Sequence, residues 1–313
     1  MTRARDTLQI SFPESDVGRP KLPALFTTEL GLSPVHRDTV MNPEYFLQSY
    51  QDSIYALKLE QSDREFIKTF FVNYSLSATD LTRFFKSPEE FLQRSILRYP
   101  FEDTLKTLFG TCYHSALEVF YKTWKLEKIR PDILLLEDTF RQKIGRFSLS
   151  ELELADAMER GMTGLRGFYE LTSTTDTLPL ELEYSANKLA LSWEVIPIKG
   201  KIDRIDEIAP GHLRIIDYKT GAPKSENALM GKTATNDVSY LQQLLFYKLM
   251  IESDPRWSGY SVDEIAIWYV EGKDNKYTLQ ILTVPPEIEA QFRVDLHAAW
   301  ENISNIDWWT NYF

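Results

Sequence analysis

Charged residues occupy a segment that otherwise reads as a β-hairpin, and their spacing points to chemistry. Residues 200–223 are GKIDRIDEIAPGHLRIIDYKTGAP. If this segment folds back antiparallel around Pro210, Asp203 stands directly opposite Asp217, with the two Cβ atoms about 5 Å apart on one sheet face. Lys219 shares that face, because side chains along a strand alternate between the faces of a sheet. Like charges held this close are destabilising unless a cation lies between them, so the pattern predicts a bound metal ion.

This trio of side chains suits the hydrolysis of a phosphodiester bond. Carboxylates and water molecules are the ligands that Mg²⁺ prefers, and its remaining coordination positions are left for phosphate oxygens. A lysine beside the ion can orient or activate the attacking water, or neutralise the charge that develops on phosphorus. The spacing alone leaves one alternative open: Asp203 and Asp206 would form a solvated strand edge, and Asp217 with Lys219 an ordinary cross-strand ion pair.

The elements before this hairpin are helical and begin at recognisable caps. Ser77 with Asp80 resembles a capping box, and Ser87 followed by Pro88 is typical of a second helix start. Periodic apolar residues predict further helices over residues 109–128 and 149–171.

The chain then changes to the alternating pattern of strands. Residues 178–218 predict a three-strand meander interrupted by Asn-Lys and Pro-Gly turns. A helix is expected over residues 239–252, a hairpin over residues 264–284 and a terminal helix from about Pro286.

The composition is that of a folded protein without membrane spans. Of the 313 residues, 43% are hydrophobic and 26% are charged, which is ordinary for a globular chain. No stretch is long and apolar enough to span a membrane, and the N-terminus lacks the apolar centre of a signal peptide, so we expect a cytoplasmic protein. The single cysteine, Cys112, excludes a cysteine-built zinc or iron–sulfur site. The net charge of −11 argues against a free-standing, tight DNA binder, because such proteins rely on a basic surface.

Five segments carry motifs in a fixed order between residues 76 and 284. They are LSATDLTRFFKSPEEFLQRSIL, FGTCYHSALE, LELEY, GKIDRID with IIDYKTG, and QLLFY. Together they resemble the RecB-like branch of the PD-(D/E)XK nuclease superfamily. The resemblance implies an α/β (α+β) fold with a restriction-endonuclease-like core, in which helices flank a central mixed β-sheet. We expect this nuclease domain over residues 76–313, preceded over residues 1–75 by an N-terminal arm and a helical linker region.

The resemblance also implies roles for individual residues. Asp203 and Asp217 would be metal ligands and Lys219 the catalytic lysine, with the backbone carbonyl of Tyr218 as an additional ligand. His114 matches the histidine that completes the metal site in this branch. Without the resemblance it would be read as a core histidine. Because imidazole suits Mn²⁺ better than Mg²⁺, either ion is expected to serve.

Three further groups follow from the same comparison of motifs. Glu183 matches the acidic residue that precedes the metal-binding strands, where it would bind a second ion or a water on the metal, although Glu181 has the same strand parity. Gln243 and Tyr247 share one helix face and match a pair that lies along the DNA path; helix packing is the alternative. Arg204 is also expected to be a DNA-binding residue.

Many RecB-like nucleases hold an iron–sulfur cluster through a cysteine at the position of Ser87, so the cluster is expected to be absent here. The N-terminal arm resembles the stretch that links a superfamily 1 helicase motor to its nuclease module, and no Walker A motif occurs. We therefore expect a metal-dependent deoxyribonuclease, more an exonuclease than an endonuclease, that cuts single-stranded DNA delivered by a helicase in cis or in trans during DNA repair. A catalytically silent scaffold with this fold and a CRISPR-associated exonuclease remain as alternatives. Cleavage polarity, RNA tolerance and oligomeric state are not encoded in these motifs.

Overall fold

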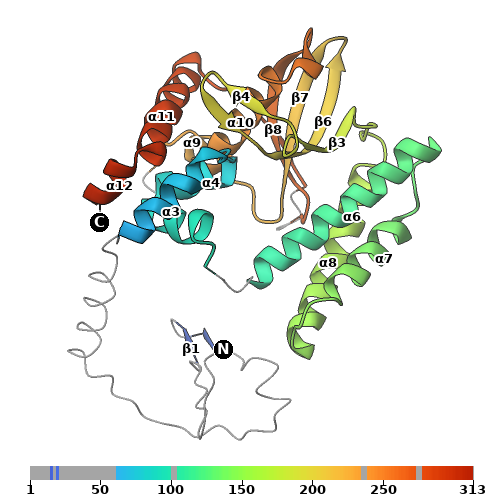
Figure 1. Ribbon diagram of the computed structural model, residues 1–313. Helices are drawn as coiled ribbons and strands as arrows, with labels where there is room; N and C mark the ends of the chain where they lie inside the picture. The colour runs from blue at the N-terminus through green and yellow to red at the C-terminus, as the bar shows by residue number, and fades with distance from the viewer. Residues whose placement is uncertain are drawn as a thin grey trace, which may run out of the picture.

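A five-stranded mixed sheet forms the centre of the molecule (Figure 1). The computed structural model describes residues 15–16, 19–20, 61–99, 104–233, 238–272 and 277–312. The strands of the sheet lie in the order β3 (Glu181–Ser185), β6 (Lys201–Ala209), β7 (His212–Lys219), β8 (Ser261–Tyr269) and β9 (Leu279–Leu282). Strands β7 and β8 are parallel, and the other neighbours are antiparallel. The predicted α/β fold with a central mixed sheet is confirmed.

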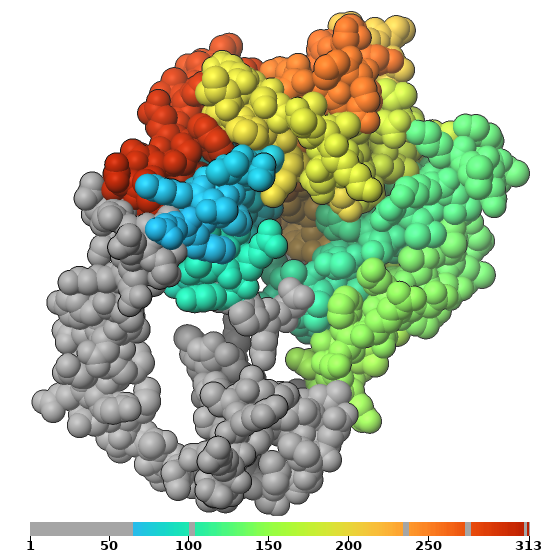
Figure 2. Space-filling view, in the orientation of Figure 1, coloured from blue at the N-terminus to red at the C-terminus, as the bar shows by residue number. Residues whose placement is uncertain are grey.

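Helices cover both faces of this sheet (Figure 1). Helices α6 (Leu105–Glu127), α7 (Ile133–Ile144) and α8 (Glu151–Leu171) share one apolar core with Ile216 and Trp268. The opposite face, which includes Ile215, packs against α4 (Ala78–Lys86), α10 (Ser239–Glu252) and α11 (Pro286–Ser304). Alternate residues of β7 and β8 therefore serve different cores, as the period of a strand requires. Figure 2 shows the surface hollowed between the blue and teal residues around α4 and the green body of α6 to α8.

The remaining elements are short or lie at the ends of the described chain. They are β1 (Ser15–Asp16), β2 (Arg19–Pro20), α3 (Gln61–Val72), α5 (Pro88–Phe91), the π-helical turn Leu92–Ile96, β4 (Leu191–Trp193), β5 (Ile196–Ile198), α9 (Glu226–Leu229), the 3₁₀ turn Pro255–Trp257 and α12 (Ile306–Tyr312). Among the helices in the described ranges, none is long and apolar enough to cross a membrane.

The predicted N-caps at Ser77 and Ser87 are confirmed, but the capping box at Ser77 is incomplete, because the Asp80 carboxylate accepts from the Ser77 hydroxyl and not from its backbone N–H. The Ser77 side chain caps α4 by accepting from the backbone N–H of Asp80, and Ser87 caps α5 with Pro88 at its first turn. Helix α6 ends at Glu127, next to the predicted residue 128. Helix α7 was not predicted, although the Asp132 side chain caps its start by accepting from the backbone N–H of Leu134. The N-terminal arm and helical linker region expected over residues 1–75 fall largely outside the described ranges, which include α3 of this region.

The β6–β7 hairpin has the predicted register. Arg204 pairs with Ile216 and Ile205 with Ile215, so Asp203 and Asp217 come directly after the last pair of the ladder. The predicted three-strand meander is correct for β3, β6 and β7 but incomplete. Between β3 and β6 along the chain, β4 and β5 form a separate two-stranded sheet.

Candidate metal centre

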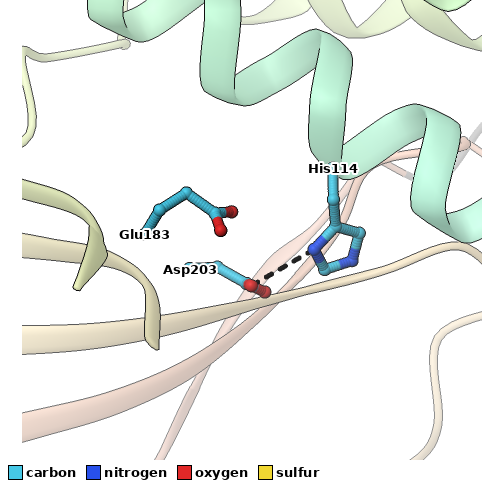
Figure 3. Close-up of side chains that lie close together, drawn as sticks. All are labelled: His114, Glu183 and Asp203. Atoms are coloured by element: carbon cyan, nitrogen blue, oxygen red, sulfur yellow. Dashed lines mark hydrogen bonds and ion pairs between the residues drawn. The ribbon is translucent and has the colours of Figure 1, made fainter. Parts of the chain in front are cut away.

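Three ligand-type side chains converge where β3 and β6 meet α6. One ligand atom from each of His114, Glu183 and Asp203 lies within 4.8 Å of the other two. Figure 3 shows the imidazole descending from α6 toward the two carboxylates, which come from neighbouring strands. Among the described residues, this is the one group of His, Cys, Asp and Glu that meets this distance criterion.

Asp203 is held at the point where β6 separates from β7. Its Oδ2 accepts the backbone N–H of Tyr218 at 2.8 Å, in the place that the next ladder bond would take. Its Oδ1 lies 3.2 Å from His114 Nδ1. Burial opposes ionisation of Asp203, but His114, the Tyr218 N–H and Lys219 outweigh it and hold the pKa of this carboxyl below its usual value. The carboxylate is therefore ionised and fixed in orientation.

His114 faces acceptors with both ring nitrogens. Nδ1 lies 3.2 Å from Asp203 Oδ1, and Nε2 lies 3.2 Å from the backbone carbonyl oxygen of Tyr218. An imidazole that serves both acceptors carries a proton on each nitrogen. Burial lowers the pKa of His114, but the charges of Asp203 and Asp217 outweigh burial and raise the pKa overall. These contacts thus favour the protonated ring, whereas binding of a metal ion requires the neutral ring.

Asp217 lies beside this group and pairs with Lys219. Its Oδ2 is 2.6 Å from Lys219 Nζ, and its side chain is 4% exposed. Burial raises the pKa of Asp217, Lys219 opposes this rise, and the charge of Asp203 adds to it. The Asp203 carboxylate is thus close enough to raise the pKa of Asp217. In the described structure Asp217 lies outside the group of three ligands, because its carboxylate is turned to the lysine.

Helix α10 holds Lys219 from the other layer. The Lys219 ammonium donates to Gln243 Oε1 at 2.9 Å, and Gln243 Nε2 donates to the Tyr247 hydroxyl at 2.8 Å. Lys219 Nζ also lies 4.7 Å from the ring centre of Tyr240. Gln243 and Tyr247, which were expected along a DNA path, thus lie on the α10 side of Lys219, and Tyr247 is buried. Their placement fits a role in positioning Lys219.

Arg204 does not have the placement of a DNA-binding residue. It is 1% exposed and lies on the α6 side of the sheet. Its guanidinium donates to Asp206 at 2.7 Å and to Asp176 at 3.2 Å, and its centre lies 4.7 Å from the ring centre of Tyr121. A buried guanidinium with these partners cannot reach a phosphate, so the expectation for Arg204 is corrected. Sequence gave no sign of this, because Asp176 is far away along the chain.

A cavity of about 580 Å³ opens beside the cluster. One face of α6 forms a wall of mostly small and polar residues, and β3, β6 and β7 form the floor. Its lysines are Lys106, Lys201 and Lys219. The sequence analysis did not predict Lys106 or Lys201 as residues of the site. Lys201 could have been predicted, because it is two residues from Asp203 and strand residues two apart share a sheet face. Glu183 also lines the cavity, whereas Glu181 is exposed on the same strand.

The residues of this centre fit a divalent cation. The set comprises three carboxylates, one imidazole and the Tyr218 carbonyl, and oxygen-rich sets with one imidazole suit Mg²⁺ and Mn²⁺. Buried Glu183 Oε2 and Asp217 Oδ2 have no hydrogen-bond partner in the described structure and are balanced by lysine ammonium groups alone. The negative charge on these oxygen atoms favours cations at this place.

A sequence model of the PD-(D/E)XK nuclease superfamily matches residues 75–311, which include every residue of the centre. No curated protein matches the chain.

Proposed function

Because the chain belongs to the PD-(D/E)XK nuclease superfamily, we propose that it hydrolyses phosphodiester bonds of single-stranded DNA with Mg²⁺ or Mn²⁺ bound at this centre. The observation that carries the proposal is the convergence of His114, Glu183 and Asp203 within 4.8 Å, next to the ion pair of Asp217 and Lys219. A structural ion-pair cluster has no need of an adjoining cavity, whereas a hydrolytic centre needs one for its substrate.

Each residue of the centre has a definite task in this proposal. Asp203, Asp217, His114 and the Tyr218 carbonyl would hold the ion, and Glu183 fits this role better than the exposed Glu181. The ion would polarise the phosphate and the attacking water. Lys219 is the group placed to stabilise charge on the phosphate oxygens, because Gln243 and Asp217 fix its ammonium at the cavity wall. Water attacks phosphorus, the bond to the leaving oxygen breaks, and the products are a phosphate monoester and a hydroxyl.

The size of the cavity supports a single strand as substrate. A space of about 580 Å³ is that of a pocket for one small ligand, which corresponds to about one or two nucleotides. The depression is open to solvent, so a strand end can enter it from outside. An exonuclease acting on a strand end fits this size better than an endonuclease acting within a duplex.

The acidic net charge supports delivery of the strand by a partner. With a net charge of −11, the chain has little general electrostatic attraction for nucleic acid. The lysines that line the cavity attract phosphate only at short range, because salt screens their charge. A helicase motor of superfamily 1, in cis or in trans, would supply the strand at a high effective concentration. On its motif order we propose that the protein belongs to the RecB-like branch and acts in DNA repair.

The test is a cleavage assay on end-labelled substrates. Wild-type protein is incubated with single-stranded DNA, duplex DNA and RNA of one sequence, each with Mg²⁺, Mn²⁺ or chelator. We expect metal-dependent shortening of single-stranded DNA, with slower or no cleavage of duplex DNA. Faster cleavage of the duplex would contradict the proposed substrate, and cleavage in chelator would contradict the proposed chemistry.

A further inference from the structure

We infer that Lys201 is a built-in cation of the metal centre, which closes the Glu183 side to a second metal ion so that the centre binds one divalent ion. The inference rests on the proposed function, and it goes further by setting the number of ions. Its starting point is the ion pair between Lys201 Nζ and Glu183 Oε2.

Lys201 reaches this carboxylate from the mouth of the cavity. It is the first residue of β6, pairs with Ser185 of β3, and has the strand parity of Asp203. The Lys201 side chain is 52% exposed, whereas that of Glu183 is 7% exposed. Both line the cavity. The charged end of a solvent-facing lysine thus lies on a carboxylate that is almost closed to water.

The backbone of Glu183 is bent so that its side chain joins the cluster. Its φ is 51°, in the left-handed region, which costs about 1–2 kcal/mol for a residue with a side chain. Its neighbours Leu182 and Tyr184 keep their pairs on β6, so the irregularity is confined to this residue. Strained backbone of this kind concentrates at functional sites. Glu183 Oε2 has no hydrogen bond among the described residues, so Lys201 is what balances this oxygen.

The charges of the cluster leave room for one divalent ion. Glu183, Asp203 and Asp217 contribute three negative charges, and Lys201 and Lys219 contribute two positive charges. With His114 neutral, as a metal ligand must be, one divalent ion makes the centre slightly positive, which suits a phosphate. A second divalent ion would add a large unbalanced charge in a largely buried place, which is unfavourable.

Loss of the Lys201 ammonium reverses this balance. Glu183 would then be a buried carboxylate without a counter-charge, within 4.8 Å of a ligand atom of Asp203. Two carboxylates at this separation can share an ion. We therefore expect the Lys201→Met variant to bind a second divalent ion there. Lys201→Arg keeps the positive charge and should bind one ion, as the wild type does.

The experiment is a Mn²⁺ titration of the full chain, read by isothermal calorimetry and by the electron paramagnetic resonance signal of unbound Mn²⁺. It compares the wild type with Lys201→Met, Lys201→Arg and the double variant Lys201→Met/Glu183→Gln. Lys188→Met, at an exposed turn, is the matched control. We expect two ions per chain for Lys201→Met and one ion for every other protein.

Two results would overturn the inference alone: a wild type that binds two ions, or a Lys201→Met variant that binds one. A wild type that binds no Mn²⁺ would contradict the proposed function itself and the inference with it. Neither readout depends on cleavage, so the two failures are distinguishable.

Discussion

Lys219 is the cation most firmly held in the centre. Asp217 lies 2.6 Å from its ammonium, Gln243 accepts from it at 2.9 Å, and the Tyr240 ring lies beside it. Burial lowers the pKa of Lys219, but the charges of Asp217 and Asp203 outweigh burial and raise it. Lys219 is therefore charged at neutral pH. In the proposed mechanism it therefore acts as a fixed positive charge and not as a proton acceptor.

Replacing this lysine should separate metal binding from catalysis. Lys219→Met is expected to lower kcat for DNA cleavage by about 10²–10⁴-fold, the range typical of a positioned catalytic group. Mn²⁺ affinity should be kept or increased, because a competing positive charge has been removed from Asp217. Single-turnover cleavage and calorimetry check the two parts. Lys188→Met serves as the control, and an unchanged kcat in Lys219→Met would exclude the assigned role.

The two glutamates of β3 should behave differently. Glu183 belongs to the ligand cluster, whereas Glu181 is exposed and pairs with Ile205 of β6. Glu183→Gln is expected to weaken Mn²⁺ binding by about 10–100-fold, as loss of a supporting group at a metal site does. Glu181→Gln should leave the affinity unchanged. Titration of both variants decides between them, and equal affinities would remove Glu183 from the centre.

The sequence predicted which residues form the centre better than it predicted the contacts that each of them makes. The relative positions of Asp203, Asp217 and Lys219 follow from the register of the β6–β7 hairpin. This register is defined by the turn between the strands and by the alternation of polar and apolar side chains. The sequence could not choose Glu183 over Glu181, because a left-handed residue within β3 overrides simple alternation. Lys201 was missed because an exposed lysine at the start of a strand is common on protein surfaces.

Helix α6 links the residues of the centre to the packing of the molecule. His114 and Tyr121 lie about two turns apart on this helix and so share one face. The Tyr121 hydroxyl donates to Asp176 Oδ2 at 2.6 Å, and Asp176 accepts from Arg204 of β6. This buried chain of partners fixes the separation between α6 and the strand that carries Asp203.

Breaking this chain should destabilise the protein. Arg204→Met leaves Asp176 and Asp206 buried without their cation, which is expected to lower the free energy of unfolding by about 3–5 kcal/mol. Arg141→Met, at a half-exposed ion pair, should change it by less than about 1 kcal/mol. Urea unfolding followed by circular dichroism measures both. A loss in Arg204→Met as small as in the control would show that the network does not hold α6.

Elements with local signals were predictable, and those set by distant partners were not. Ser87 with Pro88 fixes a helix start within a few residues, and the β6–β7 turn sets its own register. The burial of Arg204 depends on Asp176 and on the Trp268 ring, which folding brings together. No local pattern distinguishes such an arginine from one on a surface strand.

At the scale of the molecule, the described chain packs as two cores on either side of the sheet. The terminal helices belong to the same core: Ile67 of α3 and Trp309 of α12 are both fully buried in it. The family match begins at residue 75, and the nuclease domain was expected from residue 76. Since α3 precedes both positions, we propose that the folded unit begins at or before α3.

This boundary can be tested without truncation. Ile67→Ala should lower the free energy of unfolding by about 2–5 kcal/mol, as removal of a fully buried aliphatic side chain does. Val72→Ala on the same helix should have little effect, because Val72 is 77% exposed. Thermal unfolding of both variants provides the comparison. Equal stabilities would place α3 outside the folded unit.

The central claim is that the Asp203–Asp217 centre of this acidic molecule makes it a metal-dependent nuclease. The most direct measurement is the rate of cleavage of end-labelled single-stranded DNA, in Mn²⁺ and in chelator, by wild type and by Asp217→Asn. Asp263→Asn, at the exposed start of β8, is the control. We expect cleavage by wild type and control only with the metal, and a loss of about a thousandfold in Asp217→Asn, because a metal ion contributes several kcal/mol. Cleavage by Asp217→Asn at the wild-type rate would contradict the account.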